Sequence, residues 1–327
     1  MPQMTFIEAI RSAMADSMAE DNAVIVLGED VAIKGGVFLA TDGLLDKYGE
    51  NRVIDTPIAE ASIVGLAIGA SLHGLRPIAE IQFADYIHPA IDQILNEAAL
   101  FRYRSNGDWS CPIVVRAPFG AGIHGALYHS QSSEALFTST PGIKVVIPST
   151  PYDAKGLLIA AIRDPDPVIF FEHKQLYRSV RGDVPEGTYT VPIGKASVVK
   201  PGTDISLLTY GLMTHYSLTA AGVVAREGIS VEVVDLRTLY PLDKPVILES
   251  VKKTGKALIV HEDNLTGGIG GEISAIIGEY AFEHLDGPIR RLASPDVPPV
   301  AFNDELEAHY MLNPHKITDA IRDLAAY

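Results

Sequence analysis

Short apolar runs alternate along the chain with longer stretches of helical periodicity. Apolar residues recur at helical spacing from Phe6 to Met18, which predicts an amphipathic helix. Thr5 stands three residues before Glu8, and this spacing predicts a capping box at the start of that helix. The run VIVLGED at 24–30 is typical of a strand that is buried on both faces of a parallel sheet. Further strand-like runs occupy 52–54, 76–81, 112–117, 144–149 and 167–172, and helical stretches occupy 60–72, 86–101 and 151–163.

The composition changes between Arg181 and Gly202, where glycines and prolines interrupt weak strand signals. Apolar runs then resume at 204–211, 229–237, 256–263 and 288–293, with a last helix at 315–325. Strands that alternate with helices of ten or more residues indicate an α/β fold with a mostly parallel sheet. We therefore expect an α/β domain over 1–182, a crossing linker over 183–202 and a smaller α/β domain over 203–327.

Composition and charge exclude several classes of protein. The 327 residues are 47% hydrophobic and 20% charged, as in compact globular proteins. Lys and Arg number 26 against 41 Asp and Glu, and this net charge of −15 disfavours nucleic acid and anionic membranes as partners. The uncharged run at 205–225 carries too many polar residues for a membrane span and indicates a strand, a turn and a helix.

The single cysteine, Cys111, excludes an internal disulfide and is typical of a reducing compartment. We expect a cytoplasmic protein, or a protein of the mitochondrial matrix if the chain is a mature form without its transit peptide. The sequence contains no phosphate-binding loop of the Walker type, no H-E-x-x-H and no G-x-S-x-G. The common nucleotide-triphosphatase and hydrolase classes therefore lose support.

A glycine-rich loop follows the strand-like run at 112–117. Gly120, Gly122 and Gly125 spell G-x-G-x-x-G, but the next residues have no helical period, so we do not predict a dinucleotide site. His124 and His129 lie in the same loop, where a histidine is a candidate for proton transfer. Their spacing is not that of a helical metal-binding pair. The residues alone leave open whether either histidine is structural or catalytic.

Two glutamates occupy places where parallel α/β proteins bind ligands. Glu29 follows the first buried strand, and Glu60 opens a helix that is otherwise small or apolar. An acid in the first helical turn is favoured by the helix dipole alone. A carboxyl group held against apolar side chains is also easier to protonate, so Glu60 is a candidate to exchange a proton with a bound heterocycle.

Long strings of the sequence resemble a known family. VLGEDV, DTPIAEASIVGLAIGAS, AEIQFADYIHPAIDQI, PGIKVVIPSTPYDAKGLL and VVDLRTLYPLD are similar to the beta subunit of the decarboxylating component of 2-oxo acid dehydrogenase complexes. GALYHSQS and IFFEHKQLYR most resemble its branched-chain 2-oxo acid member. The resemblance covers nearly the whole chain. It implies an α/β pyrimidine-binding domain of the thiamine-diphosphate enzyme type and a smaller domain that resembles the transketolase C-terminal domain.

The same resemblance implies partners and cofactors. Members of the family form an alpha2beta2 heterotetramer, hold thiamine diphosphate between the alpha and beta subunits, and dock on a lipoyl acyltransferase core. Their small-molecule substrate is a 2-oxo acid. Magnesium belongs to the alpha side, in a motif that begins Gly-Asp-Gly, and this chain has no Gly-Asp-Gly. The absence of this motif independently indicates that the chain carries only half of a cofactor site and needs a partner.

The resemblance also implies roles for single residues. Glu60 would share a proton with the aminopyrimidine ring of the cofactor, and His129 would serve acyl transfer to the lipoyl group. The cofactor side of the site would comprise Glu29, Ile58, Ala59, Glu60, Gln82 and Tyr86. The substrate side would comprise Tyr86, Ile87, His88, Pro89 and His129. A structural potassium ion would lie near Cys111, Ile113, Val114, Ala161, Asp164 and Asp166.

Two alternatives to branched-chain decarboxylation stay open. The nearest is the same chemistry on pyruvate or acetoin. The other, from a different class, is a non-catalytic subunit that only stabilises its partner.

Overall fold

The computed structural model describes residues 1–298 and 300–327, and their packing divides the chain into two compact units. The first unit comprises Met1–Phe119 and Leu136–Ile193, and the second comprises Gly120–Ala135 and Gly194–Tyr327. The division after Ile193 falls inside the segment expected as a linker. The glycine-rich loop belongs to the second unit, although its sequence lies within the first expected domain.

The first unit is built on a parallel sheet. Its six strands run in the order β6-β7-β5-β4-β2-β3, and all neighbours among them pair in parallel. Strands β2, β5 and β7 are buried along their whole length, as predicted from their apolar runs. The strands are β2 (Val24–Gly28), β3 (Val53–Asp55), β4 (Arg76–Glu80), β5 (Val114–Phe119), β6 (Lys144–Val146) and β7 (Val168–His173).

Helix α1 (Phe6–Glu20) begins at the predicted capping box and packs against α6 (Pro151–Arg163). The Glu8 carboxylate accepts a hydrogen bond from the Thr5 N–H at 2.7 Å, and the Thr5 hydroxyl accepts one from the Glu8 N–H. Short strands β1 (Gln3–Thr5) and β8 (Arg181–Asp183) pair antiparallel. The other helices from this part of the sequence are α2 (Leu44–Tyr48), α3 (Glu60–Leu72), α5 (Ala135–Thr138) and α7 (Leu176–Ser179).

The prediction of a helix over 86–101 is confirmed in outline, because residues 88–104 are helical throughout, but the helix is irregular. After the separate turn η1 (Ala84–Tyr86), it comprises η2 (His88–Ala90), an α-helical step at 91–92, the π-helical η3 (Gln93–Glu97), η4 (Ala98–Leu100) and α4 (Phe101–Arg104). Pro89 has no N–H and sits in the first turn of η2, where none is needed. Ile87, Ala90, Ile94 and Ala98 are all buried, so the apolar spacing that predicted the helix marks the side that packs in the core.

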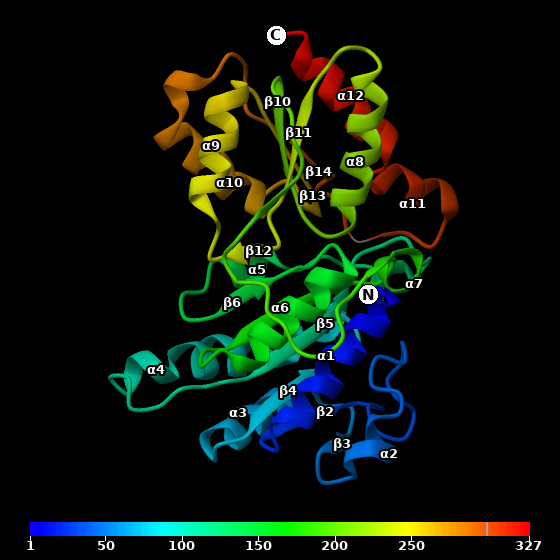
Figure 1. The fold of residues 1–327 in the computed structure, drawn as a ribbon, viewed down its shortest axis with the longest axis vertical. Helices are drawn as coiled ribbons and strands as arrows, with labels where there is room; N and C mark the ends of the chain where they lie inside the picture. Colours follow the sequence, from blue (N-terminus) through cyan, green and yellow to red (C-terminus); the bar gives the residue numbers. More distant parts are fainter. Residues whose placement is uncertain (299) are drawn as a thin grey trace. The chain divides into compact units, whose positions relative to one another are not determined.

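The second unit is a smaller α/β domain. Its sheet runs in the order β14-β13-β10-β11-β9 and is parallel except for β9. Helices α8 (Leu212–Ala225) and α12 (Pro314–Ala325) cover one face, and α9 (Lys244–Thr254) and α10 (Ile269–Tyr280) cover the other (Figure 1). The strands are β9 (Ser197–Lys200), β10 (Ile205–Thr209), β11 (Val231–Asp235), β13 (Ala257–Asn264) and β14 (Arg290–Ser294).

Several expectations for this unit can be compared with the structure. The uncharged run at 205–225 is confirmed as a strand and a helix, β10 and α8. The weak strand signals before Gly202 include a real edge strand, β9. Smaller elements are β12 (Thr238–Tyr240), η5 (Ala126–Tyr128), η6 (Phe282–His284) and α11 (Asp304–Tyr310). Across residues 1–298 and 300–327, no helix is both long and apolar enough to cross a membrane.

Candidate functional site

Three residues of the expected cofactor side lie near one another at the carboxyl ends of β2 and β4. These strands are neighbours in register, with Gly28 opposite Glu80. Glu29 directly follows β2, and Tyr86 ends the first turn after β4. Glu60 is the first residue of α3, and its charge acts on both Glu29 and Tyr86. Ligands of parallel α/β domains bind at this edge of the sheet.

The electrostatics of this edge favour a ligand group that carries a proton. Partial burial raises the pKa of Glu29, and the negative charges of Asp30 and Glu60 raise it further. The pKa of the Tyr86 hydroxyl is raised first by burial and then by nearby carboxylates, Glu60 and Glu29 among them. Lys34 opposes the effect on Glu29, but its ammonium group is hydrogen-bonded to Asp30 at 2.9 Å. A protonated heterocycle would relieve this excess of negative charge.

The start of α3 presents a carboxyl group beside exposed apolar surface. Ala59 precedes the helix and provides no side-chain cap, so the first turn leaves backbone N–H groups without a side-chain partner from that residue. Glu60 is half-buried there. The side chain of Ile58 is 75% exposed two residues earlier. An exposed apolar side chain and a half-buried carboxyl group therefore stand two residues apart at the start of α3.

The residues expected around the substrate differ in their accessibility. His88 and Pro89 are exposed, whereas Ile87 is fully buried and packs in the core. The Tyr86 ring packs edge-on against Phe83, with ring centres 6.0 Å apart. Gln82 is half-buried just beyond β4. The segment after β4 therefore offers Tyr86 and His88 at its surface and uses Ile87 to hold its place.

A buried ionic cluster beneath this edge is absent from our sequence analysis. The Arg116 guanidinium of β5 lies between the carboxylates of Glu80 on β4 and Glu172 on β7, and all three side chains are buried. Arg116 donates two hydrogen bonds to Glu172, at 2.6 and 2.7 Å, and Tyr177 donates a third at 2.7 Å. Burial raises the pKa of Glu80, and the Arg116 charge opposes this effect. The available signal was that each charged residue sits in an otherwise apolar strand.

His129 comes from the second unit, whereas Glu60 comes from the first. It is half-buried and follows η5 within the glycine-rich loop. The other histidine of this loop, His124, pairs through Nδ1 with Glu307 at 2.8 Å and with Asp304 at 3.5 Å. The hydrogen bond to Glu307 raises the pKa of His124. These three side chains are of the types that bind a metal ion, but an ion pair between the exposed His124 and the mostly buried Glu307 accounts for them equally well.

The residues expected around potassium include oxygen donors that suit a hard cation, but their carboxylates are already paired within the protein. The Asp164 carboxylate accepts two hydrogen bonds from the Lys144 ammonium group, at 2.6 and 2.7 Å, and one from the Asp166 N–H at 2.9 Å. Lys144 therefore already neutralises a carboxylate that would attract the ion. The main-chain carbonyl of Ala161 accepts a bond from the Asp164 N–H at 3.2 Å. Burial raises the pKa of the Cys111 thiol to about 11, so its sulfur is not a ligand at neutral pH.

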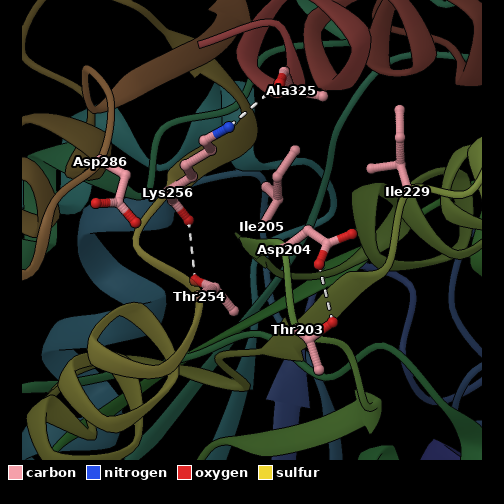
Figure 2. Close-up of a pocket in the computed structure, with 8 residues that line it drawn as sticks. All are labelled: Thr203, Asp204, Ile205, Ile229, Thr254, Lys256, Asp286 and Ala325. Carbon is pink, nitrogen blue, oxygen red and sulfur yellow. Dashed lines mark hydrogen bonds between the residues drawn. The ribbon is translucent and has the colours of Figure 1, made fainter.

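A cavity of about 350 Å³ lies in the second unit and is separate from these residues. Figure 2 shows its lining: Thr203, Asp204, Ile205, Ile229, Thr254, Lys256, Asp286 and Ala325. The Lys256 ammonium group donates to the Ala325 carbonyl at 3.2 Å, and the Thr203 hydroxyl donates to Asp204 at 2.9 Å. These polar groups bind one another, and the lining includes none of the predicted site residues. We therefore do not assign the cavity to the reaction.

Comparison with known proteins adds to this geometry. Residues 2–180 match the family "Transketolase, pyrimidine binding domain", and residues 194–317 match "Transketolase, C-terminal domain". The chain is 57% identical to the 2-oxoisovalerate dehydrogenase subunit beta of Bacillus subtilis over 327 residues, which is 100% of both chains. It is 52% identical to the pyruvate dehydrogenase E1 component subunit beta of the same organism, over 90% of this chain and 91% of that one.

Two further likenesses complete the comparison. The mitochondrial 2-oxoisovalerate dehydrogenase subunit beta of Dictyostelium discoideum is 49% identical, over 99% of this chain and 87% of that one. A solved structure, described as a split gene transketolase, inactive beta4 tetramer, matches with a TM-score of 0.79 and 24% identity. It covers 99% of this chain and 98% of its own. This likeness confirms the expected two-domain α/β fold.

Proposed function

Because the chain belongs to the family of beta subunits of 2-oxo acid dehydrogenases, we propose that it is the beta subunit of a branched-chain member. The reaction is the oxidative decarboxylation of a branched-chain 2-oxo acid, with transfer of the acyl group to the lipoyl group of the acyltransferase. The observation that carries the proposal is the 57% identity, over the full length of both chains, to a 2-oxoisovalerate dehydrogenase subunit beta. The similarity to pyruvate dehydrogenase beta subunits is slightly lower.

The cofactor of the proposed reaction is thiamine diphosphate, which when bound supplies an electron sink for the carboxyl group that is lost. In this chain Glu60 would share a proton with the aminopyrimidine ring. The exposed side chain of Ile58 would contact the ring, and Glu29, Tyr86, Ala59 and Gln82 would hold it from the same side. The alpha subunit holds the diphosphate through magnesium, because this chain has no Gly-Asp-Gly motif.

We assign the second half of the reaction to His129, which donates a proton to the lipoyl sulfur during acyl transfer. Tyr86, His88 and Pro89 face the substrate, and the buried Ile87 fixes their turn. The apolar acyl chain is bound chiefly by burial, which gives only about 1 to 3 kcal/mol of discrimination per methylene. We therefore expect the enzyme to accept several branched-chain 2-oxo acids.

The proposed assembly is an alpha2beta2 heterotetramer docked on a lipoyl acyltransferase core. The net charge of −15 suits a basic docking partner. The pyrimidine-binding domain at 1–182, the linker at 183–202 and the C-terminal domain at 203–327 are the division that we propose. For the compartment we propose the cytoplasm, or the mitochondrial matrix for a processed mitochondrial chain.

We include a potassium ion in the proposal, bound only by main-chain carbonyl oxygens. The carbonyls of Cys111, Ile113, Val114 and Ala161 are of the donor type that a hard cation prefers. Asp164 and Asp166 contribute little net charge, because Lys144 and Arg102 pair with them. The test compares the midpoint of thermal unfolding in KCl with the midpoint in NaCl at equal ionic strength. An equal midpoint in the two salts would exclude the potassium site.

Competition kinetics test the substrate assignment. The complex of this chain with a branched-chain alpha subunit is given 3-methyl-2-oxobutanoate and pyruvate together. We expect kcat/KM for the branched substrate to be higher by at least about tenfold, since its two extra methyl groups are buried. A preference for pyruvate would contradict the branched-chain assignment and leave the family assignment intact.

A further inference from the structure

The loop Gly120–Ala135, which carries His129, is fixed at both ends by carboxylates of one strand in the same unit. The Ala121 N–H donates to the Glu262 carboxylate at 2.6 Å, and the Ala135 N–H donates to the Asp263 carboxylate at 3.2 Å. Glu262 and Asp263 are consecutive residues of β13 and are only 4% and 5% exposed. Both acceptors are buried carboxyl oxygens of one strand, so these two contacts tie the beginning and the end of the loop to β13.

A third acid strengthens the connection near the end of the loop. Glu134 is fully buried and accepts a hydrogen bond at 2.8 Å from Tyr210, which follows β10. Burial, with the nearby charges of Asp263 and Glu262, raises the pKa of Glu134 well above its ordinary value. Buried carboxylates cost folding free energy, and apolar side chains of similar volume would fill such a region at lower cost. Stability alone therefore does not account for three acids here.

Inside the loop, glycines bring the backbone against His129. A Cβ atom added to Gly125 would lie 2.8 Å from the Cβ and 2.8 Å from the carbonyl oxygen of His129, closer than side chains tolerate. Gly120 and Gly122 have φ angles of 88° and 89°, which favour glycine. The Gly120 N–H donates to the Gln131 carbonyl at 3.1 Å and closes the loop across its base. The G-x-G-x-x-G pattern thus shapes a support for His129.

We propose that Glu262 and Asp263 are positioning residues for His129, through their hydrogen bonds to the two ends of its loop. The second domain then has a part in the reaction besides assembly, because it sets the place from which the histidine reaches the lipoyl group. This inference rests on the role of His129 given under the proposed function. In this proposal neither acid contacts the substrate. Each affects only acyl transfer, through the position of His129.

The test uses the complete complex with its alpha subunit, saturated with thiamine diphosphate. Glu262→Ala removes the acceptor for Ala121, and Glu262→Gln keeps an oxygen in its place. Gly125→Ala crowds His129 without changing a buried acid, so it serves if Glu262→Ala does not fold. Ser206→Ala is the matched control, because Ser206 is also fully buried in this unit but bonds to Ser250 and Thr254. His129→Ala is the reference for loss of the histidine.

Three rates are compared: acylation of a free lipoyl domain, decarboxylation with an artificial electron acceptor, and backbone hydrogen exchange over 120–135. We expect Glu262→Ala and Gly125→Ala to slow lipoyl acylation by at least about tenfold, since small misplacements of a catalytic group are costly. Electron-acceptor turnover should stay within about twofold of wild type, because only His129 is displaced. Exchange over the loop should rise in Glu262→Ala. Glu262→Gln should recover most of the acylation rate, and Ser206→Ala should change none of the three.

Two failures can be told apart. If His129→Ala slows acylation selectively but a loosened loop in Glu262→Ala does not, the positioning role is overturned and the proposed function stands. Unchanged exchange in Glu262→Ala would overturn the positioning role as well. If His129→Ala lowers both turnover rates equally, the role assigned to His129 is wrong, and the inference falls with it.

Discussion

Glu60 and Glu29 influence each other before any ligand is bound. The charge of Glu60 raises the pKa of Glu29, which burial and Asp30 have already raised. A ring nitrogen that brings a proton to Glu60 removes part of this repulsion, so binding and proton sharing support each other. These contacts make Glu60 the residue on which the proposed chemistry depends most.

Replacement of Glu60 by glutamine should therefore nearly abolish decarboxylation. The amide keeps the size of the side chain but cannot share an acidic proton, and general acid–base groups contribute about 10² to 10⁴ in rate. Turnover is measured in the assembled complex, with assembly checked by size-exclusion chromatography. Glu50→Gln, at an exposed position of the same unit, is the control. Normal turnover of Glu60→Gln would favour the non-catalytic assembly subunit.

His261 gives the second unit a pH dependence. Its ring is fully buried, and Gly268 and Gly270 approach so closely that a Cβ on either would lie within 2.7 Å of it. Burial, helped by the charge of Arg291, lowers the pKa of His261 to about 4. Below pH of about 6.5 the unfolded chain binds a proton that the folded chain refuses. Stability from this group is therefore complete above that pH and is lost as the pH falls towards 4.

Urea unfolding of the wild type and of His261→Asn between pH 7 and 4 measures this effect. We expect the wild type to lose up to about 1.4 kcal/mol more per pH unit than the variant, which corresponds to one proton. The variant is less stable at pH 7 but has the flatter profile. Parallel profiles would show that His261 takes up its proton equally in both states.

Single residues also show what local sequence can reveal. The position of Glu60 at the head of an apolar helix was predictable, because an uninterrupted run of small and apolar residues follows it. Its proximity to Glu29 was not predictable from the residues alone, since it depends on β2 and β3 being neighbours in the sheet. The resemblance to a family supplied that information. The close approach of Gly125 to His129 depends on the path of the whole loop and has no local signal.

At the scale of elements, the ionic cluster of Arg116 holds three strands together beneath the candidate site. Glu80 is the last residue of β4, and Glu172 lies near the end of β7, so the cluster spans the sheet on both sides of β5. Buried charges of this kind cost desolvation and are stable only as a complete set. We interpret the cluster as an ionic contact that holds the carboxyl ends of β4, β5 and β7 in place.

Arg116→Met should consequently be strongly destabilising. It leaves two buried carboxylates without their cationic partner, which costs about 3 to 5 kcal/mol. Arg322→Met is the matched control, because its pair with Glu227 is exposed and such pairs contribute only about 0 to 1 kcal/mol. Adding Glu80→Gln and Glu172→Gln to Arg116→Met should restore part of the loss. Urea unfolding of all three proteins gives the comparison, and equal losses for Arg116 and Arg322 would contradict this account.

The elements also differ in how well the sequence predicts them. The capping box of α1 and the strand-and-helix pair β10 and α8 follow from local spacing, and the structure has both. The segment 86–101 has the same helical spacing and is helical from residue 88 onward, but its hydrogen-bond pattern alternates between 3-10, α and π. The spacing predicts the helix and its buried side, but it does not predict where the π-helical turn η3 falls.

At the scale of the whole molecule, the proposed function divides the cofactor site between two chains. In this proposal Glu60 serves the aminopyrimidine and His129 serves acyl transfer, and this chain contains no Gly-Asp-Gly motif for a magnesium diphosphate. The proposal therefore requires a second chain.

The most direct test is thiamine-diphosphate-dependent decarboxylation of 3-methyl-2-oxobutanoate, measured first with this chain alone and then with an alpha subunit of the branched-chain type. Magnesium is present in both assays. The account predicts no turnover from the chain alone and full turnover from the mixture. Turnover from the chain alone would contradict the divided site, because it would require the chain to bind the diphosphate itself.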